Sequence, residues 1–108
     1  MAFNISGNNI EITRGDTGII EFIPDNYEFS DGDILFFTVK DDVYSEEYLF
    51  QKEIDIFIDN KAIIMISPDD TKDLDFNTYF YDIQINTADG SVNTVIEKSK
   101  FKVKEEIT

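Results

Sequence analysis

The sequence predicts an all-β protein that folds as one β-sandwich domain of about seven strands over residues 1–108. Turn signals built on Gly, Pro, Asn and Asp recur roughly every 8 to 14 residues, which is the spacing that short sandwich strands produce. Phe, Tyr, Ile, Val and Thr dominate the apolar inventory, and these side chains suit a pleated surface. No long stretch repeats its apolar residues with the period of a helix. The length fits one domain, and a hydrophobic fraction of 42% is enough for one core.

The N-terminal segment predicts two strands joined by a turn. Residues 3–12 alternate apolar and polar side chains, with a polar interruption at 6–9, so this first strand is short and broken. Arg14-Gly15-Asp16 predicts a turn, because Gly permits a positive φ and Asp bonds nearby backbone. This triplet is also an adhesion motif, but its position between two strands favours the plain turn. Residues 17–23 form the next strand, which Pro24 ends.

Residues 34–40 open with four consecutive apolar residues, which cannot alternate between a buried and a wet face. One interpretation is a central strand that is covered on both faces. The other is a strand whose outer face meets another subunit, with Leu35 and Phe37 as candidate interface residues. The sequence leaves both interpretations open.

The middle of the chain predicts two more strands and then a crossing between sheets. Residues 48–58 suggest a strand region with a bulge near its start, and 62–66 (Ala-Ile-Ile-Met-Ile) a short apolar strand. Residues 67–70 (Ser-Pro-Asp-Asp) signal a turn, and a single helical turn is expected to follow at 71–74. A strand over Tyr79–Ile85 comes next, with alternate apolar residues on one face.

The last strand is expected at residues 91–103, after a hairpin turn at Asp89-Gly90. Four of the nine cations lie in this segment at every second position, hence on one face: Lys98, Lys100, Lys102 and Lys104. The favoured interpretation is cross-strand pairing with acids such as Asp82. The alternative is a basic edge that prevents strand pairing or docks an acidic partner.

The net charge of −14, from 23 acids and 9 bases, argues against nucleic acid and anionic membranes as partners. The acids are spread along the chain, as expected for a solvated surface. The N-terminus shows no basic segment followed by an apolar run, so no signal peptide is predicted and the chain is expected to be made in a cytoplasm. No apolar run approaches the roughly 20 residues that a membrane-spanning helix needs.

The residue inventory argues against catalysis and cofactors. The chain has no Cys and no His, which removes the thiolate nucleophile and the commonest general base. A calcium loop that would start at Asp73 has Thr78 where an EF-hand needs Gly and Gln84 where it needs Glu. We therefore expect no enzyme, no cofactor and no such loop. A looser calcium site remains open among two groups of acids, Asp69, Asp70, Asp73 and Asp75 or Asp31 and Asp33.

Residues 67–81 resemble the corner at which the chain of an immunoglobulin-like domain crosses between its sheets. In that corner a tyrosine that opens the next strand bonds back to the backbone of the crossing. The resemblance implies an immunoglobulin-like Greek-key sandwich and does not decide whether Tyr79 or Tyr81 makes this bond. Its matching residues are Asp70, Thr71, Leu74, Tyr79 and Tyr81.

A second resemblance spans nearly the whole chain. It rests on the order of short motifs: Arg14-Gly15-Asp16-Thr17, Asp33-x-x-x-Phe37-x-Val39, Ser67-Pro68-x-Asp70-Thr71-x-x-Leu74, Tyr79-x-Tyr81-Asp82-Ile83, Gly90-x-Val92-x-Thr94, Phe101-x-Val103 and a closing Glu106-Ile107-Thr108. In this order the chain resembles small immunoglobulin-like domains of bacteriophage tails, and most closely the N-terminal domain of phage baseplate upper proteins.

This resemblance implies a non-enzymatic structural or interaction module of a phage or prophage tail. Its implied partners are other tail or baseplate proteins or further copies of itself, and its implied location is the host cytoplasm during assembly and then the virion. A bacterial adhesion or carbohydrate-binding sandwich is the alternative. The candidate interface residues are Leu35, Phe37, Phe80, Lys98, Lys100 and Lys102.

Overall fold

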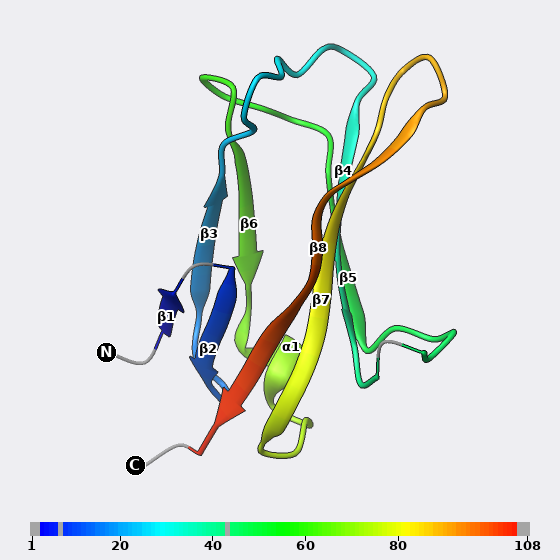
Figure 1. The fold of residues 1–108 in the computed structure, drawn as a ribbon. Coiled ribbons are helices and arrows are strands. Elements are labelled where there is room, and N and C mark those ends of the chain that lie inside the picture. The colour runs from blue at the N-terminus through cyan, green and yellow to red at the C-terminus, as the bar shows by residue number, and fades with distance from the viewer. Residues whose placement is uncertain (1–2, 7, 43, 106–108) are drawn as a thin grey trace.

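The computed structural model describes residues 3–6, 8–42 and 44–105, which form eight strands and one short helix (Figure 1). In chain order these are β1 (Phe3–Ser6), β2 (Asn9–Thr13), β3 (Gly18–Phe22), β4 (Ile34–Lys40), β5 (Phe50–Ile54), β6 (Ala62–Ile66), α1 (Pro68–Thr71), β7 (Asn77–Asn86) and β8 (Val92–Lys104). The prediction of an all-β sandwich is confirmed, with the expected broken first strand present as β1 and β2. Among the described residues, no helix is both long and apolar enough to cross a membrane.

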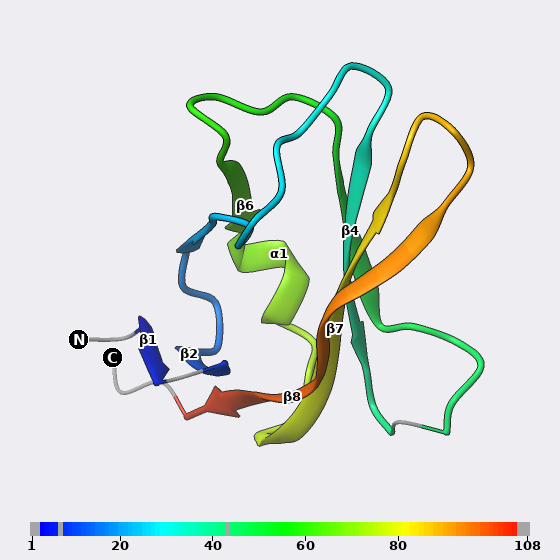
Figure 2. The same cartoon turned by 45° about the horizontal axis from the view of Figure 1, so that its top comes forward.

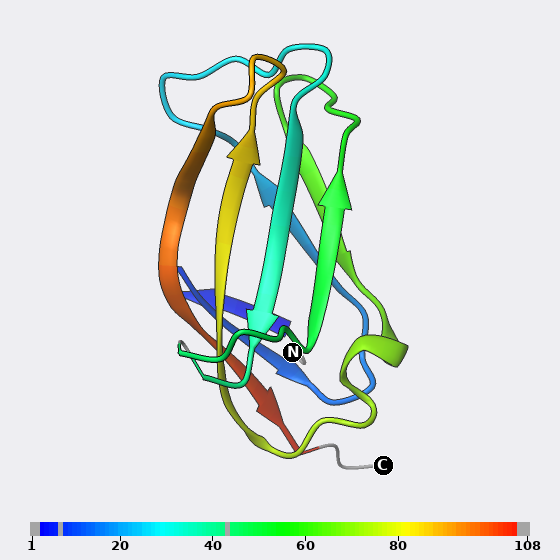
Figure 3. The ribbon, with the colours of Figure 1, turned by 90° about the vertical axis from the view of Figure 1, so that its right-hand side faces the viewer.

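The strands form a six-stranded sheet, in the order β1-β2-β8-β7-β4-β5, that faces a two-stranded sheet of β3 and β6. Figure 3 shows β8, β7, β4 and β5 side by side, with β3 and β6 behind them. β2 runs parallel to β8, and the other neighbours are antiparallel. The order corresponds to strands G-F-C-C′ facing strands B and E of an immunoglobulin sandwich.

The core lies between the two sheets, because each strand turns alternate apolar side chains inward. In β6, Ala62, Ile64 and Ile66 are fully buried, whereas the two residues between them are exposed. Phe37 lies at the centre of an aromatic cluster, with its ring centroid 5.0 Å from that of Tyr81 and 6.3 Å from that of Phe101. This cluster packs the middle of the large sheet against the small one.

Strand β4 places Leu35 and Phe37 in the core, so their placement at an interface is wrong. Both side chains are 0% exposed and belong to the core. Leu35 lies opposite Ile85 of β7 and Phe37 opposite Ile83, so the buried residues of β7 set which residues of β4 face inward. Phe36 lies on the outer face and is half-buried.

Two element boundaries also differ from the prediction. The helical turn is α1, Pro68–Thr71, rather than 71–74, because Ser67 precedes its first turn and Pro68 suits the first helical position. β5 ends at Ile54 rather than continuing to residue 58. Beyond it, Phe57 stacks on Phe29 with ring centroids 3.8 Å apart, so this segment packs on a loop instead of extending the sheet.

Candidate functional site

The corner that precedes β7 is organised by α1. The Asp70 carboxylate accepts hydrogen bonds from the backbone N–H and the hydroxyl of Ser67, at 2.8 and 3.0 Å. Lys52 of β5 places its ammonium 2.7 Å from the same carboxylate. Burial acts to raise the pKa of Asp70, but Lys52 and Ser67 outweigh it, and the pKa lies below its ordinary value. Asp70 therefore caps the helix and ties it to the large sheet.

Thr71 connects this corner to the turn between β2 and β3. Its side chain is 0% exposed, and its hydroxyl oxygen accepts a hydrogen bond from the backbone N–H of Gly15 at 2.9 Å. Gly15 has a φ of 83°, a conformation that glycine adopts without strain. Arg14 lies with its guanidinium 4.2 Å from the ring centroid of Phe76, where a cation–π contact forms. The Arg14-Gly15-Asp16 triplet is thus part of a packed turn.

The structure assigns the corner tyrosine, which the sequence left open. Tyr79 donates its hydroxyl hydrogen to the Asp75 carbonyl oxygen, four residues upstream, at 2.8 Å. Tyr81 instead donates to the carbonyl oxygen of Asn8, which lies just before β2. Leu74 is half-buried and packs against the core beneath the corner. The predicted corner residues are therefore brought together, with the exception of Tyr81, which ties β7 to the first hairpin.

Removing the corner hydroxyl provides the first test. Tyr79→Phe should lower the free energy of unfolding by about 1–2 kcal/mol, because the Asp75 carbonyl loses its partner at a half-buried site. Urea denaturation measures this difference. Tyr48→Phe, at a tyrosine that is 54% exposed, is the matched control and should change stability by less than about 0.5 kcal/mol. Equal effects of the two variants would contradict the corner assignment.

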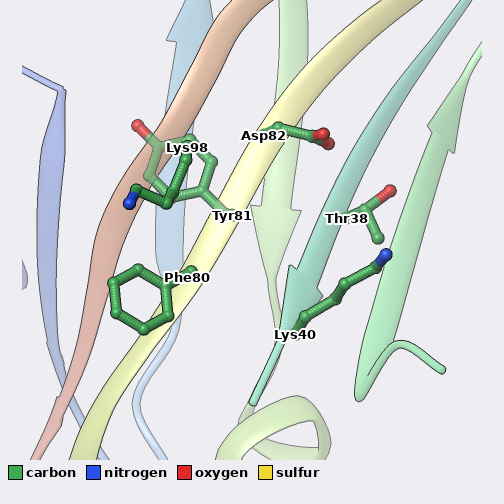
Figure 4. Close-up of a pocket in the computed structure, with 6 residues that line it drawn as sticks. All are labelled: Thr38, Lys40, Phe80, Tyr81, Asp82 and Lys98. Atoms are coloured by element: carbon green, nitrogen blue, oxygen red, sulfur yellow. The ribbon is translucent and has the colours of Figure 1, made fainter. Parts of the chain in front are cut away.

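The outer face of the large sheet holds two of the remaining predicted interface residues, Phe80 and Lys98, beside a small hollow (Figure 4). Phe80 and Lys98 lie on one side of it, Thr38 and Lys40 on the other, and Asp82 is directed from β7 toward β4. The volume is about 100 Å³, well below the roughly 300–1,000 Å³ of pockets that enclose small molecules. Burial raises the pKa of Asp82 and nearby Lys40 partly offsets this. The hollow is a surface feature rather than a binding cavity for a drug-sized ligand.

The lysines of β8 do not form the predicted pairs with Asp82. Lys98 places its ammonium 5.9 Å from the centroid of the Phe80 ring, and Lys104 pairs with Glu11 of β2 at 3.7 Å. Asp82 has Lys40 as its charged neighbour instead, because β4 lies on that side of β7. Lys100 and Lys102 are exposed and stand opposite Phe80 and Thr78 in the register.

Among the acids considered for calcium, Asp33 has a structural position, as Asp70 does at the corner. Asp33 is 1% exposed, and its carboxylate accepts hydrogen bonds from the Tyr27 hydroxyl and from the backbone N–H groups of Ser30 and Ala88. Within residues 3–6, 8–42 and 44–105, no group of three or more acidic side chains is arranged to hold a metal ion.

A surface that the sequence analysis missed lies on the small sheet. Ile19, Ile63 and Met65 point away from the core and are 53%, 43% and 54% exposed. Ile19 and Met65 are direct cross-strand partners, and Ile63 lies two residues before Met65 on the same face. We call these three residues the aliphatic face. Its signal in the sequence is the unbroken apolar run Ala-Ile-Ile-Met-Ile, because a strand with one solvent-exposed face usually alternates apolar and polar residues.

Comparison of the chain with models of protein families, with curated proteins and with solved structures found no match.

Proposed function

We propose that this chain is a non-enzymatic interaction module of a phage or prophage tail assembly, and that it binds through the aliphatic face. The observation that carries the proposal is the group of three neighbouring exposed apolar side chains on β3 and β6. A soluble surface exposes single apolar residues freely, whereas a contiguous group on one sheet face is typical of a protein–protein contact.

The composition of this surface favours a protein partner. Ile19, Ile63 and Met65 are aliphatic, and burying them removes apolar area from water without leaving a polar group unpaired. Glu21 and Lys61 lie beside them and approach each other to 3.9 Å, so a charged pair borders the apolar centre. An apolar centre with a polar rim is the usual anatomy of an interface.

The placement in a tail rests on the order of motifs in the sequence, and the structure supplies the surface. Assembly in the host cytoplasm followed by incorporation into the virion is part of the proposal, as is contact with other baseplate proteins or a second copy. The adhesion or carbohydrate-binding alternative is less favoured, because sugar-binding faces are built on aromatic rings and the aliphatic face has none.

Particle incorporation tests this function. Tail particles purified from cells that produce the chain should contain it, and the double variant Ile63→Ser, Met65→Ser should be incorporated at least about tenfold less, which corresponds to about 1.4 kcal/mol. Mass spectrometry of the particles measures the amount. Ile56→Ser, at an isoleucine that is 74% exposed outside the strands, is the matched control and should be incorporated normally.

Two results would contradict the proposal in different ways. Absence of the wild-type chain from tail particles would refute the tail role. Normal incorporation of a folded double variant would refute the aliphatic face as the binding surface. Light scattering of the purified chain, with and without the double substitution, shows whether a second copy uses the same face.

A further inference from the structure

One edge of the small sheet is open. β3 bonds to β6 on one side, and within the described residues no strand bonds to its other side. A constant-type immunoglobulin sheet has a strand A beside strand B at this place. Here the first strands instead join the large sheet, β1 through β2 and β2 through β8. An unpaired edge presents backbone N–H and C=O groups that can bind another strand.

An apolar groove of about 330 Å³ runs along this open edge. β6 contributes none of its lining, so the groove lies on the side of β3 that β6 does not cover. Figure 2 shows β1 and β2 together with the end of β8, which pairs with β2. The apolar lining residues are Ile10, Ile20, Phe22, Ile23, Ile83 and Ile96.

The lining changes from buried to exposed across the groove. Ile10 and Ile83 are 1% exposed at its base, whereas Ile23 is 59% exposed at its mouth. Core residues of the large sheet therefore form the base of the groove at the edge of the small sheet. A side chain that enters from the edge would contact the hydrophobic core directly, which is the arrangement that gives specificity when a strand is added to a sheet.

The segment that includes β3 is acidic, and Lys61 approaches its Glu21 to 3.9 Å. Residues 15–39 contain six acids, Asp16, Glu21, Asp25, Glu28, Asp31 and Asp33, and no Lys or Arg. Glu21 lies within β3, on the outward face, and also lines the groove. A segment that docks here meets the carboxylate of Glu21 on its outward side, and a basic residue complements it.

We propose that the open edge of β3 binds an extended segment of a partner protein in which apolar residues alternate with Lys or Arg. The segment takes the empty position beside β3 and pairs with its backbone. Side chains in a strand alternate between faces, so apolar residues enter the groove next to Ile20 while basic residues point outward beside Glu21. This inference rests on the proposed role as an interaction module and names the partner's binding element.

A synthetic peptide tests the inference on the full chain. The probe is a seven-residue peptide of alternating Lys and Val with blocked ends. Its two controls are the same peptide N-methylated on every backbone amide, which keeps the charge but removes all backbone donors, and a peptide of alternating Glu and Val. Amide hydrogen exchange of the protein, resolved by residue, is the measurement.

We expect the Lys–Val peptide to slow exchange within residues 18–23 by about tenfold or more and the N-methylated peptide to leave it unchanged. The Glu–Val peptide should bind at least about tenfold more weakly. Glu21→Lys should reverse the preference between the two charged peptides. Ile23→Lys, at the mouth of the groove, should abolish protection, whereas Ile56→Lys should leave it intact.

Equal protection by the N-methylated peptide, or none by the Lys–Val peptide, would overturn the proposal. Protection of the same amides that rises with protein concentration alone would assign the edge to a second copy of the chain and would also overturn it. The double variant of the aliphatic face should still bind the peptide. Failure of the peptide experiment is therefore separate from failure of particle incorporation.

Discussion

Replacing Asp33 with alanine should lower the free energy of unfolding by about 3–5 kcal/mol, because three hydrogen-bond donors lose a buried, charged acceptor. The donors come from Tyr27, Ser30 and Ala88, so this one carboxylate joins the loop that precedes β4 to the turn between β7 and β8. Urea denaturation followed by circular dichroism measures the loss.

Asp31→Ala is the matched control for this prediction. Asp31 is an exposed acid two residues away, and its replacement should change stability by less than about 0.5 kcal/mol. If both variants lose the same stability, the effect comes from altered net charge and the structural role of Asp33 is refuted. Gly32, which lies between the two acids, is not a suitable control, because a Cβ at this position would lie 2.8 Å from the Cβ of Ala88.

The same site predicts how stability depends on pH. The Tyr27 hydroxyl, followed by the backbone of Ser30, holds the pKa of Asp33 below its ordinary value of 3.8. Because the pKa is lowered in the folded state, the ionised Asp33 side chain stabilises the fold fully above pH 3.8. This stabilisation is lost as the pH falls through the folded pKa. Asp33→Asn should therefore remove part of the acid sensitivity of unfolding.

Tyr27 shows the opposite dependence. Its hydrogen bond to Asp33, with burial second, raises the pKa of Tyr27 from 10.0 to about 12. The stabilisation of the fold by the protonated Tyr27 hydroxyl is therefore complete below pH 10.0 and is lost as the pH rises toward about 12. An absorbance titration of the wild type against Tyr27→Phe locates the transition. A Tyr27 that ionises near pH 10 would contradict the hydrogen bond.

Phe37→Ala should also lower the free energy of unfolding by about 3–5 kcal/mol, since a fully buried aromatic side chain leaves a cavity at the centre of the core. Phe36→Ala, one residue earlier on the half-buried outer face, is the control and should cost about 1 kcal/mol or less. Thermal and urea unfolding measure both. A larger loss for Phe36→Ala would mean that β4 turns its other side to the core.

The corner before β7 shows how much local chemistry can predict. Ser67, Pro68 and Asp70 signal a helix start in any context, because capping depends on residues within one turn. The sequence nevertheless predicts this helical turn three residues late, with Thr71 at its beginning rather than at its end. No local pattern predicts that the hydroxyl of Thr71 accepts a hydrogen bond from the backbone of Gly15, which is 56 residues away in the sequence.

The sequence by itself determined the all-β class, the strand positions to within a few residues, the corner and the absence of Cys and His chemistry. These follow from the two-residue period of strands, from turn residues and from composition, which act over short distances along the chain. It also placed Phe80 and the lysines of β8 on the outer face.

The buried side of β4 and the surfaces that remain uncovered depend on the tertiary structure. The run at 34–37 is apolar on both faces, so its sequence does not say which face is inside, and pairing with Ile83 and Ile85 of β7 turns Leu35 and Phe37 into the core. The aliphatic face and the open edge of β3 likewise depend on how many strands each sheet contains. Sheet membership is set by pairing between distant segments, and no local pattern encodes it.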